Sequence, residues 1–127
     1  SRNDRSLVVL VQLLGTSVLF TGDIELTTEN LLREHLSSGT VDILKVPHHG
    51  SRTSSTPEFL RWVNPRTAVI SQDTRRGHPH RLVLERFRER GIPAWLTSYG
   101  GEVSFWPSVE GGAAASRFPD TQGMGSR

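Results

Sequence analysis

The sequence contains no cysteine, a single lysine and no long apolar run. Without cysteine there are no disulfides and no thiolate metal sites, so a metal ion here would need histidine and carboxylate ligands. No stretch of about 18 consecutive apolar residues occurs, which excludes a membrane-spanning helix within these residues. The opening residues, SRNDRSLVVL, also lack the small-residue cleavage site of a signal peptide.

A strong excess of charge is missing too. Fifteen lysine and arginine residues oppose 13 aspartate and glutamate residues, which gives a net charge of +2 with histidine neutral. So small a surplus is compatible with a phosphate-bearing partner but does not indicate one. The length of 127 residues fits one domain with a sizeable core and is too short for two.

What the chain does contain is an alternation of apolar runs typical of strands and amphipathic segments typical of helices. We expect strands at 6–14, 18–23, 41–47, 67–72, 93–98 and 101–106, and helices at 24–38, 55–63 and 81–91. The order strand-strand-helix-strand-helix-strand-helix-strand-strand predicts an α/β domain over residues 1–106. Residues 107–127 are small, polar and glycine-rich, which predicts a flexible tail.

Local signals support two of these helices. Thr56 and Pro57 predict a helix start, because threonine caps helices and proline fits the first helical position. In the segment 24–38, Leu31, Leu32 and Leu36 recur at helical spacing, and Gly39 lies just past the expected end of the helix.

Polar side chains follow three of the expected strands at the point where each strand ends. Asp23 closes the strand VLFTGD, His48 and His49 follow DILKVP, and His78 and His80 lie in the loop after TAVISQ. Functional groups gather at the carboxyl ends of strands in such folds, so we expect these clusters to lie side by side. A carboxylate with several imidazoles suits zinc or manganese.

Each cluster also has an ordinary structural explanation. Asp23 is suited to a turn or a helix cap, and a histidine pair in a loop is often only solvated. The residues GHPH fit a helix start. The metal hypothesis gains weight only because all three clusters fall at the same predicted edge of the sheet.

The segments SLVVLVQLLGTSVLFTGDIE, VDILKVPHHGSRTSS and NPRTAVISQDTRRGHPH resemble the metallo-β-lactamase-fold domain of the ComEC competence proteins. Those are bacterial membrane proteins that move DNA into the cell. The resemblance covers residues 3–106 and implies half of an αββα sandwich with a metal site along one edge. It also implies a parent protein in the cytoplasmic membrane, with this domain soluble and outside the cytoplasm.

The resemblance implies roles for individual residues. Asp23 would be the acidic ligand, and one or both of His48 and His49 would reach the metal, with His49 preferred as ligand and His48 as proton donor. His78 matches the last histidine of the family and would join the site. His80 has no counterpart and is expected to be a helix-start residue.

One departure from the family is large. The leading His-x-His-x-Asp-His motif, or its variant with aspartate at the second position, is absent, and His35 is the one histidine before residue 48. In the family this motif lies upstream, so the chain resembles the C-terminal half of the domain. We therefore expect Zn²⁺ or Mn²⁺ in the complete domain and no tightly bound ion in this chain alone. An uncovered sheet face would also pair with the missing N-terminal half or with a second copy.

The implied chemistry is hydrolysis of a phosphodiester, most plausibly in DNA. Hydroxyl groups after the histidines would bond phosphate oxygens, and nearby guanidinium groups would hold the strand through its phosphates; these residues are Ser51, Thr53, Ser54, Ser55, Arg52, Arg75 and Arg76. For Arg52, Arg75 and Arg76, the simpler interpretation is that they are solvated surface residues. Two other functions stay open: a non-catalytic nucleic-acid-binding or structural module, and a stand-alone metallohydrolase of another ester.

Overall fold

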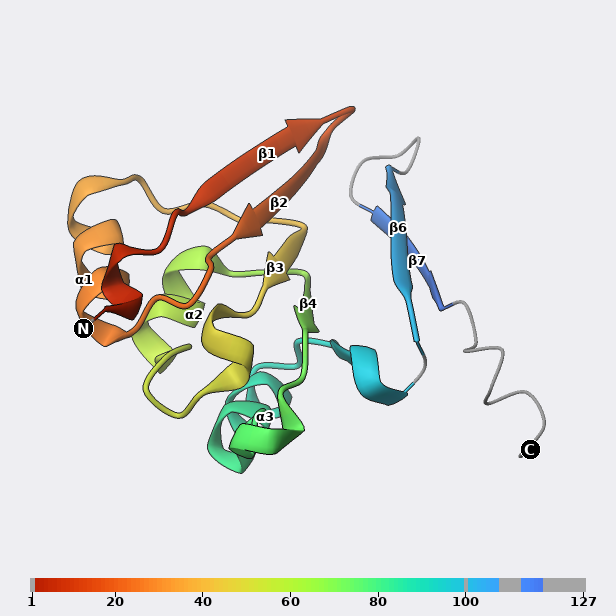
Figure 1. Ribbon diagram of the computed structural model, residues 1–127. Coiled ribbons are helices and arrows are strands. Elements are labelled where there is room, and N and C mark those ends of the chain that lie inside the picture. Colours follow the sequence, from red (N-terminus) through yellow and green to blue (C-terminus); the bar gives the residue numbers. More distant parts are fainter. Residues whose placement is uncertain (1, 100, 108–112, 118–127) are drawn as a thin grey trace.

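The computed structural model describes residues 2–99, 101–107 and 113–117 (Figure 1). Its larger sheet has five strands in the order of the sequence: β1 (Val9–Leu13), β2 (Thr16–Phe20), β3 (Ile43–Lys45), β4 (Thr67–Ile70) and β5 (Ala94–Leu96). β1 and β2 form an antiparallel hairpin, whereas β2, β3, β4 and β5 are parallel. The α/β class and the predicted order of elements are confirmed.

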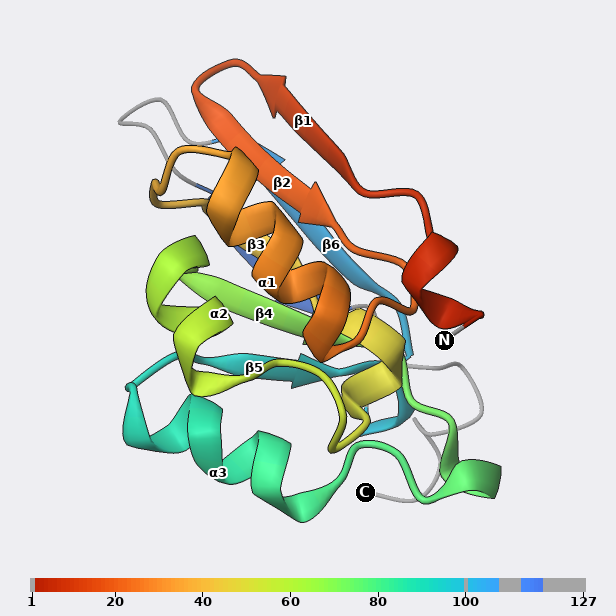
Figure 2. The same ribbon diagram turned by 90° about the vertical axis from the view of Figure 1, so that its left-hand side faces the viewer.

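Three helices connect the parallel strands and cover one face of this sheet (Figure 2). They are α1 (Leu26–His35), α2 (Pro57–Val63) and α3 (Arg81–Glu89). Short 3-10 turns lie at Asn3–Arg5, Pro47–Gly50, Thr74–Arg76 and Thr97–Tyr99. As predicted, α2 begins after a Thr56 cap, whose Oγ1 accepts a hydrogen bond from Phe59 N at 3.2 Å.

The core lies between the helices and the sheet. Its buried members alternate along the strands and recur at helical spacing: Leu19, Ile24, Leu44, Val46, Phe59, Leu60, Val63, Ala68, Ile70, Val83 and Phe87. Of the three leucines at helical spacing in the segment 24–38, Leu31 is 48% and Leu36 54% exposed. Leu32 packs on the core, but the residue of α1 that is fully buried is Glu29.

The other face of the sheet is less well covered. β1 is exposed along its whole length, and Leu13 and Phe20 are 62% and 47% exposed. A second, two-stranded sheet lies on this side, opposite the helices (Figures 1 and 2). The rings of Trp95 and Phe105 meet edge to face, 6.2 Å between centroids, and link β5 to this second sheet.

The second sheet includes residues that fall within the predicted tail, 107–127. β6 (Val103–Pro107) pairs antiparallel with β7 (Ala113–Arg117), so residues 113–117 form a strand. β6 and β5 belong to different sheets, and β6 pairs with β7. Within the part of the chain that the structure describes, none of the helices is long and apolar enough to cross a bilayer.

Candidate functional site

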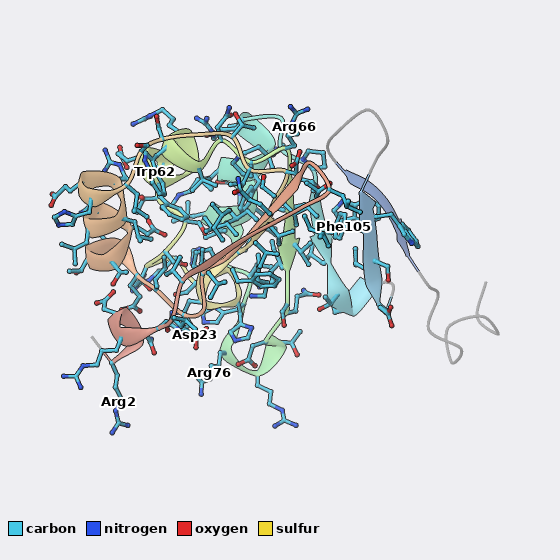
Figure 3. All side chains as sticks on the ribbon, turned by 90° about the horizontal axis from the view of Figure 1, so that it is seen from above. Arg2, Asp23, Trp62, Arg66, Arg76 and Phe105 are labelled. Atoms are coloured by element: carbon cyan, nitrogen blue, oxygen red, sulfur yellow. The ribbon has the colours of Figure 1, made fainter. Side chains whose placement is uncertain are left out.

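The side chains predicted at strand ends lie at one edge of the sheet. β2, β3 and β4 are parallel, so their carboxyl ends are neighbours. Asp23 Oδ1 lies 3.7 Å from His49 Nε2. The ring centroids of His48 and His78 are 5.5 Å apart. We call this edge, defined by these four residues, the histidine rim; Figure 3 shows Asp23 there, on the same side of the molecule as Arg76.

The turn that carries Asp23 is anchored from two sides. The fully buried Thr21 donates its hydroxyl to Lys45 O at 2.6 Å, which ties the end of β2 to the end of β3. Gly22 has φ +55°, and a Cβ at that position would lie 2.8 Å from Ser6 Cβ. Asp23 N donates to Ser6 Oγ at 3.1 Å. Glycine is needed for this close approach, and the anchored backbone leaves the Asp23 side chain directed toward the rim.

The two histidines after β3 lie on a strained backbone. His48 and His49 have φ of +48° and +55°, in the left-handed region that non-glycine residues rarely occupy. Gly50 follows with φ +82°, and a Cβ there would lie 2.7 Å from Pro79 Cβ. His48 N donates to Gly22 O at 3.0 Å, which joins this turn to the Asp23 turn. Left-handed residues cost about 1–3 kcal/mol each and occur preferentially where side chains have a function.

His49 is held in the orientation of a metal ligand. Its Nδ1 lies 2.8 Å from Ser71 O, and because a carbonyl only accepts, Nδ1 must carry the proton. The neutral ring then has its lone pair on Nε2, the atom that faces Asp23. Metal-ligating histidines generally donate their other ring nitrogen to a carbonyl or carboxylate in this way.

His48 has a different neighbour. Its Nδ1 is buried, has no hydrogen-bond partner and lies 3.4 Å from Glu25 Oε1. The same carboxylate oxygen accepts a hydrogen bond from Thr53 Oγ1 at 2.9 Å. Sequence reasoning missed Glu25, although it lies two residues after Asp23. Its contact with His48 depends on the turn at residues 47–50, which the sequence pattern did not reveal.

His78 and His80 have separate roles, as expected. His78 Nδ1 is buried without a partner, and burial, followed by the neighbouring His48 ring, lowers the pKa of His78 below its usual value. The ring is therefore neutral at neutral pH. His80 instead begins α3: its Nδ1 accepts a hydrogen bond from Leu82 N at 3.2 Å. The prediction that His80 is a helix-start residue is confirmed.

The hydroxyl-rich loop after the histidines is bonded mostly to itself. Ser54 is fully buried and donates to Pro47 O at 3.1 Å and to Ser51 O at 3.0 Å. Ser51 is also buried, with its Oγ 3.0 Å from Thr53 Oγ1. Arg52 and Thr53 are exposed. The predicted substrate contacts stay predictions, and within this loop Arg52 and Thr53 are the two that are exposed.

A second carboxylate that the sequence did not reveal, Glu29 of α1, fixes the end of this loop. It accepts hydrogen bonds from Ser55 N, from Thr56 N at 3.0 Å and from Thr56 Oγ1 at 2.7 Å. Arg86 of α3 donates to the carbonyls of Ser54 and Ser55 at 3.0 and 3.1 Å. Burial raises the pKa of Glu29, while these hydrogen bonds and the charge of Arg86 act in the opposite direction.

The single lysine also lies next to the histidine rim. Lys45 Nζ donates to Val46 O at 3.0 Å. Burial lowers the pKa of Lys45, and the nearby Asp23 carboxylate acts in the opposite direction. The rim and the adjacent Lys45 therefore bring together a carboxylate, imidazoles and one amino group.

The rim suits part of a metal site. Asp23 and His49 offer an oxygen and a correctly oriented nitrogen, the ligand types that zinc and manganese take. Among the described residues, however, no group of three or more histidine, aspartate or glutamate side chains is arranged to hold an ion. A two-ligand site leaves a divalent ion largely hydrated, so further ligands would be needed for tight binding.

No family model matches the chain. It is 35% identical over 107 residues to "ComE operon protein 3" of Bacillus subtilis (strain 168), an alignment that covers 83% of this chain. It is 37% identical over 103 residues, 80% of this chain, to "Recombination protein 2" of Haemophilus influenzae. It is 34% identical over 118 residues, 91% of this chain, to "Competence protein ComA" of Neisseria gonorrhoeae.

The chain spans 13 to 17% of the length of these three proteins, so the similarity concerns one segment of each. The similarity to "Competence protein ComA" takes in nine-tenths of the chain, and the histidine rim with it. The chain is therefore a homologue of one segment of the ComEC-type competence proteins.

Proposed function

We propose that this chain supplies part of a metal-dependent phosphodiester hydrolase site in a DNA-uptake protein. The observation that carries the proposal is the pairing of Asp23 Oδ1 with His49 Nε2 at 3.7 Å, with His49 Nδ1 held on Ser71 O. A carboxylate oxygen and an oriented imidazole nitrogen on one rim are what the family resemblance requires of the acidic ligand and of the histidine ligand.

Asp23 and His49 would hold Zn²⁺ or Mn²⁺ together with ligands from outside the described residues. When bound, the ion would lower the pKa of a water molecule to about 7 and so supply a nucleophile at neutral pH. Burial lowers the pKa of His78, so its ring is neutral. It is suited to accept a proton or to make a further contact at the rim.

His48 is assigned the proton transfer. In hydrolysis of a phosphodiester, the water oxygen forms a bond to phosphorus, the bond from phosphorus to the leaving oxygen breaks, and that oxygen takes up a proton. The buried Nδ1 of His48 faces a carboxylate rather than a carbonyl, at 3.4 Å from Glu25 Oε1. Its other ring nitrogen then donates to the leaving oxygen.

Arginines around the rim would hold the nucleic acid through its phosphates. Arg52 precedes Thr53 in the exposed part of the loop, and Arg75 and Arg76 lie in the 3-10 turn after β4. Figure 3 shows Arg76 on the same side of the molecule as Asp23. These contacts would position the strand without reading its sequence. The parent protein would lie in the bacterial cytoplasmic membrane, with this domain outside the cytoplasm.

The open face of the sheet supports the sandwich arrangement in the complete protein. Val9, Val11 and Leu13 of β1 and Phe20 of β2 are 37 to 62% exposed on a chain whose helices cover the other face. At about 25 cal/mol per Å² of apolar surface, covering such a face contributes many kcal/mol. The sheet from the missing N-terminal half of the αββα sandwich is the proposed cover, and a second copy of the chain would substitute for it in isolation. A monomer at high concentration in sedimentation would contradict that substitution.

A second candidate is a nucleic-acid-binding module without catalysis, favoured by the absence of a three-residue metal group among the described residues. One experiment separates the two: the complete protein is incubated with single-stranded DNA and Mn²⁺ or Zn²⁺, and cleavage and binding are both measured. We expect metal-dependent cleavage that Asp23→Ala and His49→Ala abolish with binding retained.

The matched control is Arg66→Gln, because Arg66 lies at the opposite edge of the molecule from Asp23 (Figure 3). It should cleave as well as the unchanged protein. Cleavage that survives Asp23→Ala would refute the hydrolase, and binding without any metal-dependent cleavage would establish the second candidate.

A further inference from the structure

Glu25 occupies the cap position of α1 without capping it. Its backbone is extended there, with φ −123° and ψ −176°, yet its side chain makes no hydrogen bond to the first turn of the helix. Capping is normally done by serine, threonine, asparagine or aspartate, whose short side chains reach the free N–H groups. The longer glutamate side chain is directed elsewhere, so its identity is not explained by the helix start.

The backbone of Glu25 is nevertheless held on several sides. Its N–H donates to Asp4 Oδ1 at 3.3 Å, and its carbonyl accepts from Glu29 N at 3.0 Å. The next residue, Leu26, donates its N–H to Thr53 O at 3.1 Å. The carboxylate therefore extends from a fixed point, which is the requirement for a residue that orients another side chain.

The carboxylate lies between the hydroxyl-rich loop and His48. Oε1 accepts from Thr53 Oγ1 at 2.9 Å and lies 3.4 Å from His48 Nδ1. Both partners are largely shielded, since the side chains of His48 and Glu25 are 12% and 21% exposed. His48 Nδ1 has no hydrogen-bond partner, and a buried donor in that state is unfavourable. The nearest carboxylate is thus the acceptor this ring nitrogen lacks.

The two adjacent histidines then have parallel support. His49 is oriented through Nδ1 by the carbonyl of Ser71, and His48 through Nδ1 by the carboxylate of Glu25. We propose that Glu25 is a positioning residue, which closes onto His48 Nδ1 and so presents the opposite ring nitrogen of His48 to the leaving oxygen of a phosphodiester. Hydrogen bonds of this kind are often long in the free protein and shorten when substrate binds. The assignment of a leaving oxygen rests on the proposed function; the orientation of the ring does not.

The orientation is tested first on this chain, without DNA or metal. The ¹⁵N chemical shifts of His48, recorded at a pH where its ring is neutral, show which ring nitrogen carries the proton. We expect the proton on Nδ1 in the unchanged chain and in Glu25→Gln, which retains an acceptor oxygen. We expect it on Nε2 in Glu25→Ala. Glu25→Met, which keeps the length of the side chain but not the acceptor, replaces the alanine variant if that variant does not fold.

The matched control is Glu58→Ala, an exposed glutamate of α2 that pairs with Arg61. It should leave the His48 shifts unchanged. An Nδ1 proton that persists in Glu25→Ala or Glu25→Met would overturn the positioning role, whatever the activity of the complete protein.

Cleavage by the complete protein is the second readout. Loss of a group that orients a functional histidine typically lowers activity about 10- to 100-fold. We expect a loss of that size in kcat for Glu25→Ala, with KM little changed and partial recovery in Glu25→Gln. If the unchanged protein does not cleave DNA, the proposed function fails while the tautomer result still decides the role of Glu25. Equal cleavage by Glu25→Ala and the unchanged protein would refute the catalytic part of the inference.

Discussion

Two polar regions lie close together at the start of α1 and differ in how well their groups are satisfied. The Glu29 cluster, made of Glu29, Ser55, Thr56 and Arg86, is largely buried, and its carboxylate accepts three hydrogen bonds, although Ser55 has φ +53° and its Oγ is buried without a partner. The histidine rim is half-exposed, contains two buried ring nitrogens without partners and has a left-handed backbone. A carboxylate whose oxygens are hydrogen-bonded within the protein stabilises a fold, whereas unpaired ring nitrogens at a half-exposed edge indicate a place for a ligand. Asp23 and Glu29, two carboxylates six residues apart, thus have different roles: Asp23 is available for a ligand and Glu29 stabilises the fold.

The strongest test of this contrast is Glu29→Ala. The substitution leaves Ser55 N and Thr56 N without their acceptor inside the protein. Since each buried unsatisfied donor is unfavourable by about 1–3 kcal/mol, we expect the free energy of unfolding to fall by about 3 kcal/mol. Urea denaturation measures it. Glu58→Ala, at an exposed site on α2, is the control and should change stability by less than about 0.5 kcal/mol. A loss below about 1 kcal/mol for Glu29→Ala would mean that the cluster is not structural.

Gly50→Ala tests whether the histidine turn itself tolerates change. The new Cβ would lie 2.7 Å from Pro79 Cβ and on a backbone with φ +82°. We expect a loss of about 2 kcal/mol in the free energy of unfolding, because left-handed strain and a close contact combine. Gly39→Ala is the control, since a Cβ there meets no atom within 4 Å. Equal stability of the two variants would show that the turn relaxes freely and that its strain has been overstated.

The pH dependence of stability sharpens the comparison further. Burial raises the pKa of Glu29 above its ordinary value of 4.5, so the folded chain keeps this proton to higher pH than the unfolded chain. Between the two pKa values the folded state binds more protons, and stability falls as pH rises through that window. We expect the free energy of unfolding, taken relative to Glu29→Gln, to decrease when the pH is raised from below 4.5 to neutral. An increase would show that the hydrogen bonds outweigh burial and that the folded pKa is lowered instead.

Much of the rim could be predicted from the sequence, because its members are the first polar residues after apolar strands. The ends of parallel strands meet, so Asp23 and His49 could be assigned to one edge before their distance was known. The same local chemistry predicted the Thr56 cap and the helix start at His80. These features depend on residues within a few positions of one another.

The features that were missed depend on residues far apart in the chain. Glu25 and Glu29 take their roles from Thr53, Ser55 and Thr56, which are 26 to 28 positions away. The helical spacing of the leucines predicted the helix α1, but not that Glu29 would be its buried residue, because Glu29 is bonded to backbone donors of the distant loop. Pairing of residues 113–117 in β7 also has no local signal, because it depends on an available edge of β6.

Asp23→Asn should have the smallest effect on stability and so completes the contrast. The Asp23 side chain is 46% exposed, and its contact with His49 Nε2, at 3.7 Å, is too long for a hydrogen bond. An exposed pair of this kind contributes about 0–1 kcal/mol, so we expect the free energy of unfolding to change by less than about 0.5 kcal/mol. The backbone bond from Asp23 N to Ser6 Oγ is kept, which leaves the turn intact. Urea denaturation of Asp23→Asn and of Glu29→Gln under the same conditions provides the comparison. A loss above about 1.5 kcal/mol would mean that Asp23 stabilises the turn, and the argument that its carboxylate is available for a ligand would then fail.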